Sequence, residues 1–585
     1  MNRLRILPLL VITALLLTTA CDGCGACSRT DVDADAEKRL SELAGALPAD
    51  TEAALVAPDL GELAQTLDYA FGRMEHFDPD ARAAENQINQ MLGFRITDIE
   101  SWDAAGFAPN SSIIFAMVDG RPVMTGYIDD KNAFQTHVIG RMRRTTETSV
   151  AIQDETYGER EFQISGNPPV SDMAWYYEGS QVVLIFPPLE ALRPLISNSA
   201  AEVAEVLGGV DADSSLAAHE GFAEFRRGVG DDYPVSLYAE AESIADETDL
   251  EAMPMFITGF GPLLQAMMKW SQNQAGGTGI GFRAGDQRLE LRAFAAGDED
   301  LMEEARAAQT TAVETGWDGM LTENTTIAAR TSFDLSGAVD AFLESLPDEE
   351  RQQAERELDQ AGPAGLNLRE DILEALSGHS LLVFYGVGGD IDSAVRPLTQ
   401  GRIGTGLRIA LANSGLLFSL HFADADKLQV LLDAANEAGS EFVERRPLEV
   451  DGQAVDGFEV FQPLDLSMAP FRAFITEQSI TFAASGIGES AAHQYLTDAR
   501  EESRLADVEG LALGNAFAES DNVNGLYVNF ANIRSNMRNI PFMAGYANAI
   551  RMVHELLMTA GVDDHGFYVT TQLDFSDPLE DDGDQ

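Results

Sequence analysis

Two apolar stretches with the same layout dominate the pattern of hydrophobic and polar positions along the chain. Met253–Arg283 consists of an apolar run, a polar and glycine-rich turn, and a short strand-like segment, and Ile540–Val569 repeats this succession. Each run contains a proline near its start, at Pro254 and Pro541. Because proline is tolerated in the first turn of a helix, we predict that both runs begin a helix at an equivalent place and continue into a strand.

The same correspondence extends to the start of each half of the chain. Leu47–Leu67 reads as a loop, a short apolar strand over Ala53–Ala57 and a helix, and Leu321–Leu346 repeats this order. Asp59 precedes the first of these helices, where its carboxylate can accept hydrogen bonds from free backbone N–H groups. Asp334 has the equivalent place in the second half.

Alternating segments joined by turn residues predict β-hairpins in both halves. In the first half, two strand patterns meet at Asp119–Gly120, a pair suited to a tight turn. In the second half, an insertion over Gly388–Thr405 interrupts the pattern, and we predict a hairpin that turns at Asn413–Gly415.

Further matched segments follow these hairpins. Asp130–Lys131 aligns with Asp426–Lys427 at the start of a predicted helix, and Leu237–Tyr238 aligns with Leu526–Tyr527. An aspartate at a helix start is explained by capping and by the helix dipole. The paired lysines have no comparable explanation.

Antiparallel hairpins with intervening helices predict an α+β fold in two homologous domains, each an antiparallel sheet of hairpins covered by helices. We place the first domain at residues 45–300 and the second at residues 316–577, followed by an acidic tail at 578–585. A chain of 585 residues with 45% hydrophobic content can bury two such cores.

The N-terminus carries the features of an export signal. Residues 1–20 form a short basic start and an apolar run that ends in Ala20, and Cys21 follows directly. This arrangement resembles the lipobox of bacterial lipoproteins, which implies cleavage before Cys21 and acylation of its thiol, although Thr18 stands where that family usually has leucine. The alternative is a plain secretory signal. We interpret residues 21–44 as a tether between the lipid anchor and the folded body.

Cys24 and Cys27 complete the cysteines of the chain. Because they lie on a short tether of small residues, a tether disulfide or free thiols explains them better than a metal or cluster site. The acidic run that follows approaches the spacing of a calcium loop, but Ala36 stands where such a loop needs glycine. We therefore interpret this run as a solvated acidic segment.

The formal net charge of −58 excludes a nucleic-acid-binding role, which requires basic patches. The acidic residues are spread over both halves, so we interpret them as solvation of the whole surface, with a calcium-binding acidic surface as the alternative.

The LPADT segment that begins at Leu47, together with the strand, helix and repeated hairpins after it, resembles a family of bacterial envelope proteins. That family consists largely of lipoproteins and is classified only as a domain of unknown function. The resemblance covers nearly all of the mature chain and implies an exported, anchored and repeat-built protein. It implies no catalytic residue.

Local motifs for catalysis are absent from the sequence. No two histidines have the i, i+4 spacing of a zinc-binding helix, and no GxSxG segment is present. The sequence therefore predicts no catalytic residue, no metal site and no cofactor, and we expect no enzymatic activity.

The apolar helices are the remaining candidate for a binding site. A helix that is apolar on most sides is usually buried, and we include Leu556 and Leu557 in the second one. A hydrophobic ligand groove is the alternative, because methionine-rich surfaces adapt to acyl chains. Its candidate contacts would be Met255, Phe256, Phe260, Phe542, Met543 and Tyr546.

These observations predict a lipid-anchored protein of the bacterial cell envelope that faces the periplasm or the cell surface. We expect a non-catalytic binding or scaffolding module that contacts the membrane through its anchor and an envelope protein as its partner. A carrier of a lipid or other apolar ligand is the alternative. The third possibility, from another class, is a hydrolase whose site is assembled from distant residues.

Overall fold

A computed structural model of the chain shows mixed α and β structure in two compact units. The first unit comprises Met1–Met302 with Val562–Thr570, and the second comprises Glu303–Gly561 with Thr571–Gln585. The structure describes residues 34–77, 81–145, 152–167, 170–187, 198–229, 233–240, 277–285, 287–297, 302, 315, 317–332, 343, 351–352, 355, 367, 369, 375–387, 414–424, 426–428, 430, 433, 443–445, 448–450, 453–455, 457–460, 471–475, 478–484, 503–519, 524–538, 553–562 and 565–575.

The first unit contains a long antiparallel sheet. Its strands are β1 (Ala53–Ala57), β2 (Ile113–Val118), β3 (Arg121–Tyr127), β4 (Ile152–Tyr157), β5 (Arg160–Asn167), β6 (Val170–Glu178), β7 (Gln181–Ile185), β8 (Val235–Glu240), β9 (Gly277–Gly285) and β10 (Arg288–Ala296). They pair in the order β10–β9–β8–β1–β2–β3–β7–β6–β5–β4, and every pair is antiparallel.

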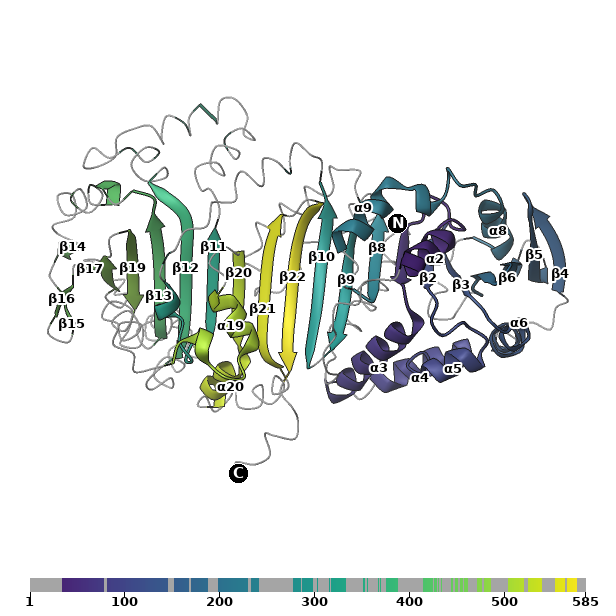
Figure 1. Cartoon of the computed structure of the whole chain (residues 1–585), viewed down its shortest axis with the longest axis horizontal. Coiled ribbons are helices and arrows are strands. Elements are labelled where there is room, and N and C mark those ends of the chain that lie inside the picture. Colours follow the sequence, from purple (N-terminus) through teal and green to yellow (C-terminus); the bar gives the residue numbers. More distant parts are fainter. Residues whose placement is uncertain are drawn as a thin grey trace, which may run out of the picture. The chain divides into compact units, whose positions relative to one another are not determined.

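Helices of the first unit connect these strands. They are α2 (Ala34–Ala44), α3 (Leu60–Phe77), α4 (Ala81–Leu92), α5 (Ile99–Ala104), α6 (Lys131–Phe134), the π-helical turn η2 (Gln135–Ile139), α7 (Gly140–Thr145), α8 (Ala200–Gly208), the 3₁₀ turn η3 (Leu216–Ala218) and α9 (Glu220–Val229). Figure 1 shows α3, α4 and α5 running together beside this sheet.

Apolar side chains cover both faces of the first sheet because successive residues of a strand point to opposite sides. Ile113 belongs to a core that includes Leu63 of α3 and Trp102 of α5. Its neighbour Ile114 belongs to a second core that includes Leu43 of α2 and Phe225 of α9. The sheet therefore lies between two helical layers.

The second unit has its own antiparallel strands. They are β11 (Ile327–Ser332), β12 (Leu376–Val387), β13 (Ser414–Phe422), β14 (Val443–Arg445), β17 (Gly457–Val460), β18 (Phe471–Ile475), β19 (Ser479–Ala484), β20 (Asn524–Asn529) and β21 (Val553–Val562). They pair in the order β21–β20–β11–β12–β13–β19–β18–β17–β14. This order matches, strand for strand, the order β9–β8–β1–β2–β3–β7–β6–β5–β4 in the first unit.

The remaining elements of the second half are a separate hairpin, short helices and the last strand. They are β15 (Leu448–Val450), β16 (Gln453–Val455), η6 (Trp317–Met320), η9 (Leu505–Asp507), α19 (Ala512–Glu519), α20 (Phe530–Arg538) and β22 (Gly566–Phe575). The core of this unit includes Trp317, Leu381, Leu417 and Tyr527.

Several local predictions are confirmed in the first unit. The β2–β3 hairpin turns at Asp119 and Gly120, whose φ angles of 49° and 69° are the positive values that a tight two-residue turn requires. Asp59 accepts a hydrogen bond from the Glu62 N–H (3.0 Å), and Asp130 accepts from the N–H groups of Asn132 and Ala133. Both aspartates cap helices as expected.

The predicted tether at residues 21–44 is wrong over its last part. Residues Ala34–Ala44 form helix α2, and Leu40 and Leu43 are buried in the core of the first unit. The acidic residues of this segment occupy the exposed side of an amphipathic helix. Because they are so numerous, the apolar side formed by Leu40 and Leu43 was not recognised in the sequence. The folded body therefore begins at or before residue 34.

Three predictions for the second half are also wrong. Ser414 and Gly415 lie inside β13, opposite Val387 and Gly386, so the hairpin does not turn at Asn413–Gly415. Val553–Val562 is a strand rather than the end of a helix, and Leu557 pairs with Tyr527. Runs of leucine and methionine allow either structure, and pairing with β20 decides between them.

The third error concerns a helix cap. Asp424 accepts hydrogen bonds from the N–H groups of Asp426 (2.8 Å) and Lys427 (3.4 Å), so the capping residue lies two positions before Asp426. Asp130 therefore corresponds to Asp424, and the two lysines of the sequence alignment do not correspond.

We predict that α2 stabilises the first unit. Leu43→Ala should lower the free energy of unfolding by about 2 to 4 kcal/mol, because it leaves a cavity in a packed core. Lys38→Ala on the same helix is the matched control and should change it by less than about 0.5 kcal/mol, since the Lys38 side chain is 74% exposed. Urea unfolding of each variant measures both values. Equal effects of the two variants would show that α2 is not docked.

Candidate binding cleft

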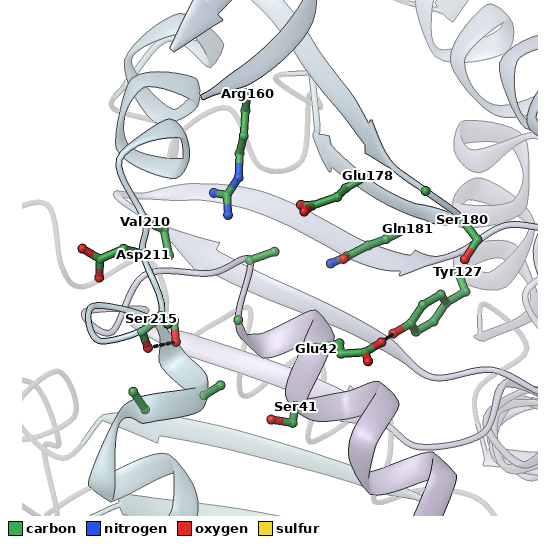
Figure 2. Close-up of a pocket in the computed structure, with 16 residues that line it drawn as sticks. Ser41, Glu42, Tyr127, Arg160, Glu178, Ser180, Gln181, Val210, Asp211 and Ser215 are labelled. Atoms are coloured by element: carbon green, nitrogen blue, oxygen red, sulfur yellow. Dashed lines mark hydrogen bonds between the residues drawn. The ribbon is translucent and has the colours of Figure 1, made fainter. Parts of the chain in front are cut away.

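A cleft of about 840 Å³ opens beside α2 in the first unit. Five segments form its walls: the end of α2, the end of β3, the start of β5, the β6–β7 turn and the loop before α9. Figure 2 shows Arg160, Glu178 and Gln181 pointing into the same space, with Ser41 and Glu42 of α2 on the opposite side.

The β6–β7 hairpin places two of these side chains. Gly179 has a φ of 62°, which allows a tight turn, and Glu178 pairs with Gln181 across it. Paired residues of an antiparallel hairpin project from the same face of the sheet. Tyr176 lies two residues before Glu178 on that face, within the core that α2 covers.

Arg160 and Glu178 carry opposite charges into the cleft without forming an ion pair. The Arg160 guanidinium donates to the Leu207 carbonyl oxygen and lies 5.4 Å from the centre of the Tyr176 ring. Glu178 is exposed and has no hydrogen bond or ion pair within the described part of the chain. Both groups therefore retain capacity for a ligand.

Hydrogen bonds and an ion pair connect α2 to the rest of the first unit. The Tyr127 hydroxyl donates to Glu42 Oε2 (2.6 Å), and Arg226 Nη2 lies 2.7 Å from Glu37 Oε1. Burial, and then the hydrogen bond with the Glu42 carboxylate, raise the pKa of Tyr127 above its ordinary value. Tyr127 is therefore a neutral donor at neutral pH, and it joins the wall formed by α2 to the wall formed by β3.

A second cleft of about 1030 Å³ shares Arg160, Glu178, Val210 and Asp211 with the first. Tyr176 and Tyr177 are among the residues that line it. Lys131 Nζ lies 3.8 Å from the centre of the Tyr177 ring, and the Tyr177 hydroxyl donates to Gln135 Oε1 (2.7 Å). Lys131 is thus explained by its aromatic contact.

The Tyr176 hydroxyl differs from that of Tyr177. Tyr176 is only 3% exposed, and its hydroxyl has no hydrogen-bond partner among the residues that the structure describes. Burial raises the pKa of Tyr176 to about 12, so the hydroxyl is protonated at neutral pH. A buried hydroxyl without a partner costs free energy, and such groups in native structures call for an explanation.

The residues that line the two clefts include serines and carboxylates. Neither cleft has a histidine or cysteine among the lining residues that the structure describes. Within the described ranges, no group of three or more histidine, cysteine, aspartate or glutamate side chains has the geometry of a metal site. The same ranges contain no helix with the length and apolarity needed to cross a bilayer.

A serine and a histidine do meet in the second unit. Ser377 Oγ lies 3.0 Å from His421 Nδ1, and the centres of the His379 and His421 rings are 6.3 Å apart. Ser377 Oγ also donates to the His421 carbonyl oxygen and accepts from the His379 N–H. These bonds join the ends of β12 and β13, so we interpret the group as structural.

Glu555 is a buried carboxylate in the second unit. It accepts hydrogen bonds from the N–H groups of Leu513 (3.2 Å) and Gly514 (2.9 Å) at the start of α19, and from the Tyr527 hydroxyl (2.8 Å). Burial raises the pKa of Glu555, and these three bonds oppose that effect. Glu555 therefore acts as the cap of α19.

All of the site residues predicted from the sequence lie outside the described residues. They are Cys21, Met255, Phe256, Phe260, Phe542, Met543 and Tyr546. Sequence reasoning missed Arg160, Tyr176 and Glu178. No local pattern distinguishes these residues, because the cleft depends on sheet order and on the position of α2.

The comparisons with known proteins give little information. No protein family and no curated protein matches the chain. Crystal form I of TP0453 is similar to 46% of this chain over 86% of its own length, with 9% identity and a TM-score of 0.18. Crystal form III of TP0453 is similar over 46% and 87%, with 9% identity and a TM-score of 0.17. Similarity at this level bears on neither fold nor function.

We predict a pH-dependent contribution of Glu555 to stability. In the folded state the pKa of Glu555 is raised above the ordinary 4.5. Over the pH range just above 4.5, Glu555 is therefore protonated in the folded state and ionised in the unfolded state. The stability that Glu555 contributes is thus present at low pH and decreases as the pH rises. The difference in free energy of unfolding between wild type and Glu555→Gln should fall over this range.

Urea unfolding between pH 4.5 and pH 8 measures this difference. Glu519→Gln removes an exposed carboxylate at the other end of α19 and is the matched control, because it makes the same charge change away from the cap. A difference for Glu555→Gln that stays constant or grows with pH would contradict the prediction.

Proposed function

We propose that this chain is an exported lipoprotein of the bacterial cell envelope, anchored through Cys21, whose body is a non-catalytic binding module. The observation that carries the binding role is the cleft beside α2, into which Arg160 and Glu178 point without pairing with each other. Charged groups with free capacity in a cleft of this size are a feature of ligand sites.

The basic start, the apolar run and the cysteine after Ala20 support export and anchoring. About a dozen residues separate Cys21 from α2, and an extended chain of that length reaches roughly 40 Å. The anchor is thus close enough to keep the first unit near the membrane surface. This position agrees with an envelope partner as the bound molecule.

Internal duplication is part of the proposal. The order of strand pairing recurs in both units, and two matched positions support the alignment. Ala54 and Ala328 lie opposite Tyr238 and Tyr527, which themselves pair with β9 and β21. The recurrence supports two homologous domains that have since acquired different side chains.

A second candidate function is the carriage of an apolar ligand. Leu382, Phe418 and Phe482 form a row across β12, β13 and β19, and Leu382 and Phe418 are 40% and 36% exposed. The rings of Phe418 and Phe482 are stacked. An exposed apolar row of this kind can contact an acyl chain.

Lipidation makes a direct prediction. Full-length protein expressed in a bacterial host with a radiolabelled fatty acid should carry the label and remain in the membrane fraction, whereas Cys21→Ser should lose both properties. Cys24→Ser is the matched control and should behave like wild type. Labelling of Cys21→Ser would refute the proposed anchor.

Photo-crosslinking in the envelope tests the binding role. The photoreactive residue p-benzoylphenylalanine in place of Ser180, which lines the cleft, should give a covalent adduct that mass spectrometry can identify. The same residue in place of Glu100, an exposed position on α5, should not. If Ser180 gives no adduct, the cleft is not a binding site in cells.

The same method at Leu382 tests the second candidate. A lipid adduct at Leu382, with none at Ser180, would favour the carrier over the cleft-binding module.

A further inference from the structure

We propose that the two clefts together hold an extended, positively charged polypeptide segment, and that the Tyr176 hydroxyl bonds to its backbone. This inference rests on the proposed binding function and adds the class of ligand. It follows from four properties of the clefts: an unsatisfied hydroxyl, the sign of the charge, the covered aromatic rings and the shared wall.

The unsatisfied hydroxyl points to a ligand with hydrogen-bond acceptors. Tyr176 lines the second cleft, is 3% exposed, and has a hydroxyl without a partner in the described part of the chain. A phenolic O–H donates to a carbonyl oxygen at ordinary hydrogen-bond distance. Peptide carbonyl oxygens recur along an extended chain, so a polypeptide supplies the missing acceptor.

The charge of the second cleft selects cationic ligands. Asp154, Glu159, Glu161 and Glu178 line it, and all of these carboxylates are exposed and have no ion pair within the described ranges. Arg160 and Lys131 are the basic residues among the lining side chains. An anionic ligand would therefore face net repulsion, whereas lysine and arginine side chains would be attracted.

The aromatic rings argue against a saccharide. A sugar ring needs a free aromatic face for stacking, but Arg160 lies over the Tyr176 ring and Lys131 lies over the Tyr177 ring. These two cations also show that positive charge is accommodated beside both rings. The cleft therefore favours further basic groups next to its carboxylates over an uncharged ring.

The shared wall indicates a ligand longer than either cleft. Arg160, Glu178, Val210 and Asp211 belong to both clefts, and each cleft alone has the volume of a small-molecule site. A chain that passes these four residues contacts both clefts. A polyamine could also do so, but it supplies donors only and leaves the Tyr176 hydroxyl without an acceptor.

Binding of a defined peptide tests the inference. The probe is a fluorescent, N-acetylated and C-amidated decapeptide of alternating lysine and alanine, and anisotropy with the soluble body from Arg29 to Gln585 measures its dissociation constant. Tyr176→Phe should weaken binding about threefold to tenfold, the range expected for one hydrogen bond. It should leave the melting temperature unchanged or slightly raised, because it removes a hydroxyl that has no partner.

A charge-matched pair of variants separates the cleft from the acidic surface. Glu178→Gln should weaken binding, and the loss should shrink as salt is added. Glu155→Gln removes an exposed carboxylate from β4 that does not line either cleft, and it should have little effect.

Equal affinity of wild type and Tyr176→Phe for the peptide would overturn the inference, as would equal effects of Glu178→Gln and Glu155→Gln. Spermine should bind wild type and Tyr176→Phe equally, because it offers no acceptor to the hydroxyl. A loss of spermine affinity in Tyr176→Phe as large as the loss of peptide affinity would identify a general cation site instead. A non-peptide adduct at Ser180 in the crosslinking experiment would leave the binding function in place and refute only the polypeptide ligand.

Discussion

The first unit depends on a sheet that is apolar on both faces. Ile113 and Ile114, like Trp175 and Tyr176, are adjacent residues that enter opposite cores. Such a sheet cannot leave either face in water, so helices must cover both. On one face, α3, α4 and α5 supply the cover, and on the other α2 joins α8 and α9. The cleft exists because α2 covers its face only as far as the ends of β3, β6 and β7.

The two units satisfy the same structural need with different chemistry. Tyr238 and Tyr527 are buried at matching places in the strand order, and each has a hydroxyl that requires a partner. The Tyr238 hydroxyl lies 3.3 Å from His219 Nδ1, whereas that of Tyr527 donates to Glu555. By register, Glu555 corresponds to Gly277, where a Cβ atom would meet the Gly221 carbonyl oxygen at 1.7 Å. In the first unit α9 therefore packs directly on β9. In the second unit the Glu555 carboxylate caps α19.

The sequence was sufficient for features that depend on nearby residues. The Asp119–Gly120 turn, the caps at Asp59 and Asp130 and the strand character of Ala53–Ala57 follow from local chemistry. Features set by distant pairing were missed. The strand Val553–Val562 has a composition that also suits a helix, and α2 has too many acidic residues for its two buried leucines to stand out. The residues that line the cleft range from Ser41 to Ala218 in the sequence. They lie close together only because of the strand order and the position of α2.

The position of α2 connects the cleft with the N-terminal part of the chain. Ser41 and Glu42 face the cleft, while Leu40 and Leu43 hold the helix on the sheet. A molecule that contacts both α2 and the β6–β7 turn adds its binding free energy to the docking of that helix. The coupling is reciprocal: undocking α2 from the sheet lowers the affinity for that molecule by the same factor by which the bound molecule favours docking. A force along the chain that pulls α2 from the sheet therefore weakens binding. Through this one helix, mechanical tension on the N-terminal part of the chain and occupancy of the cleft would oppose each other.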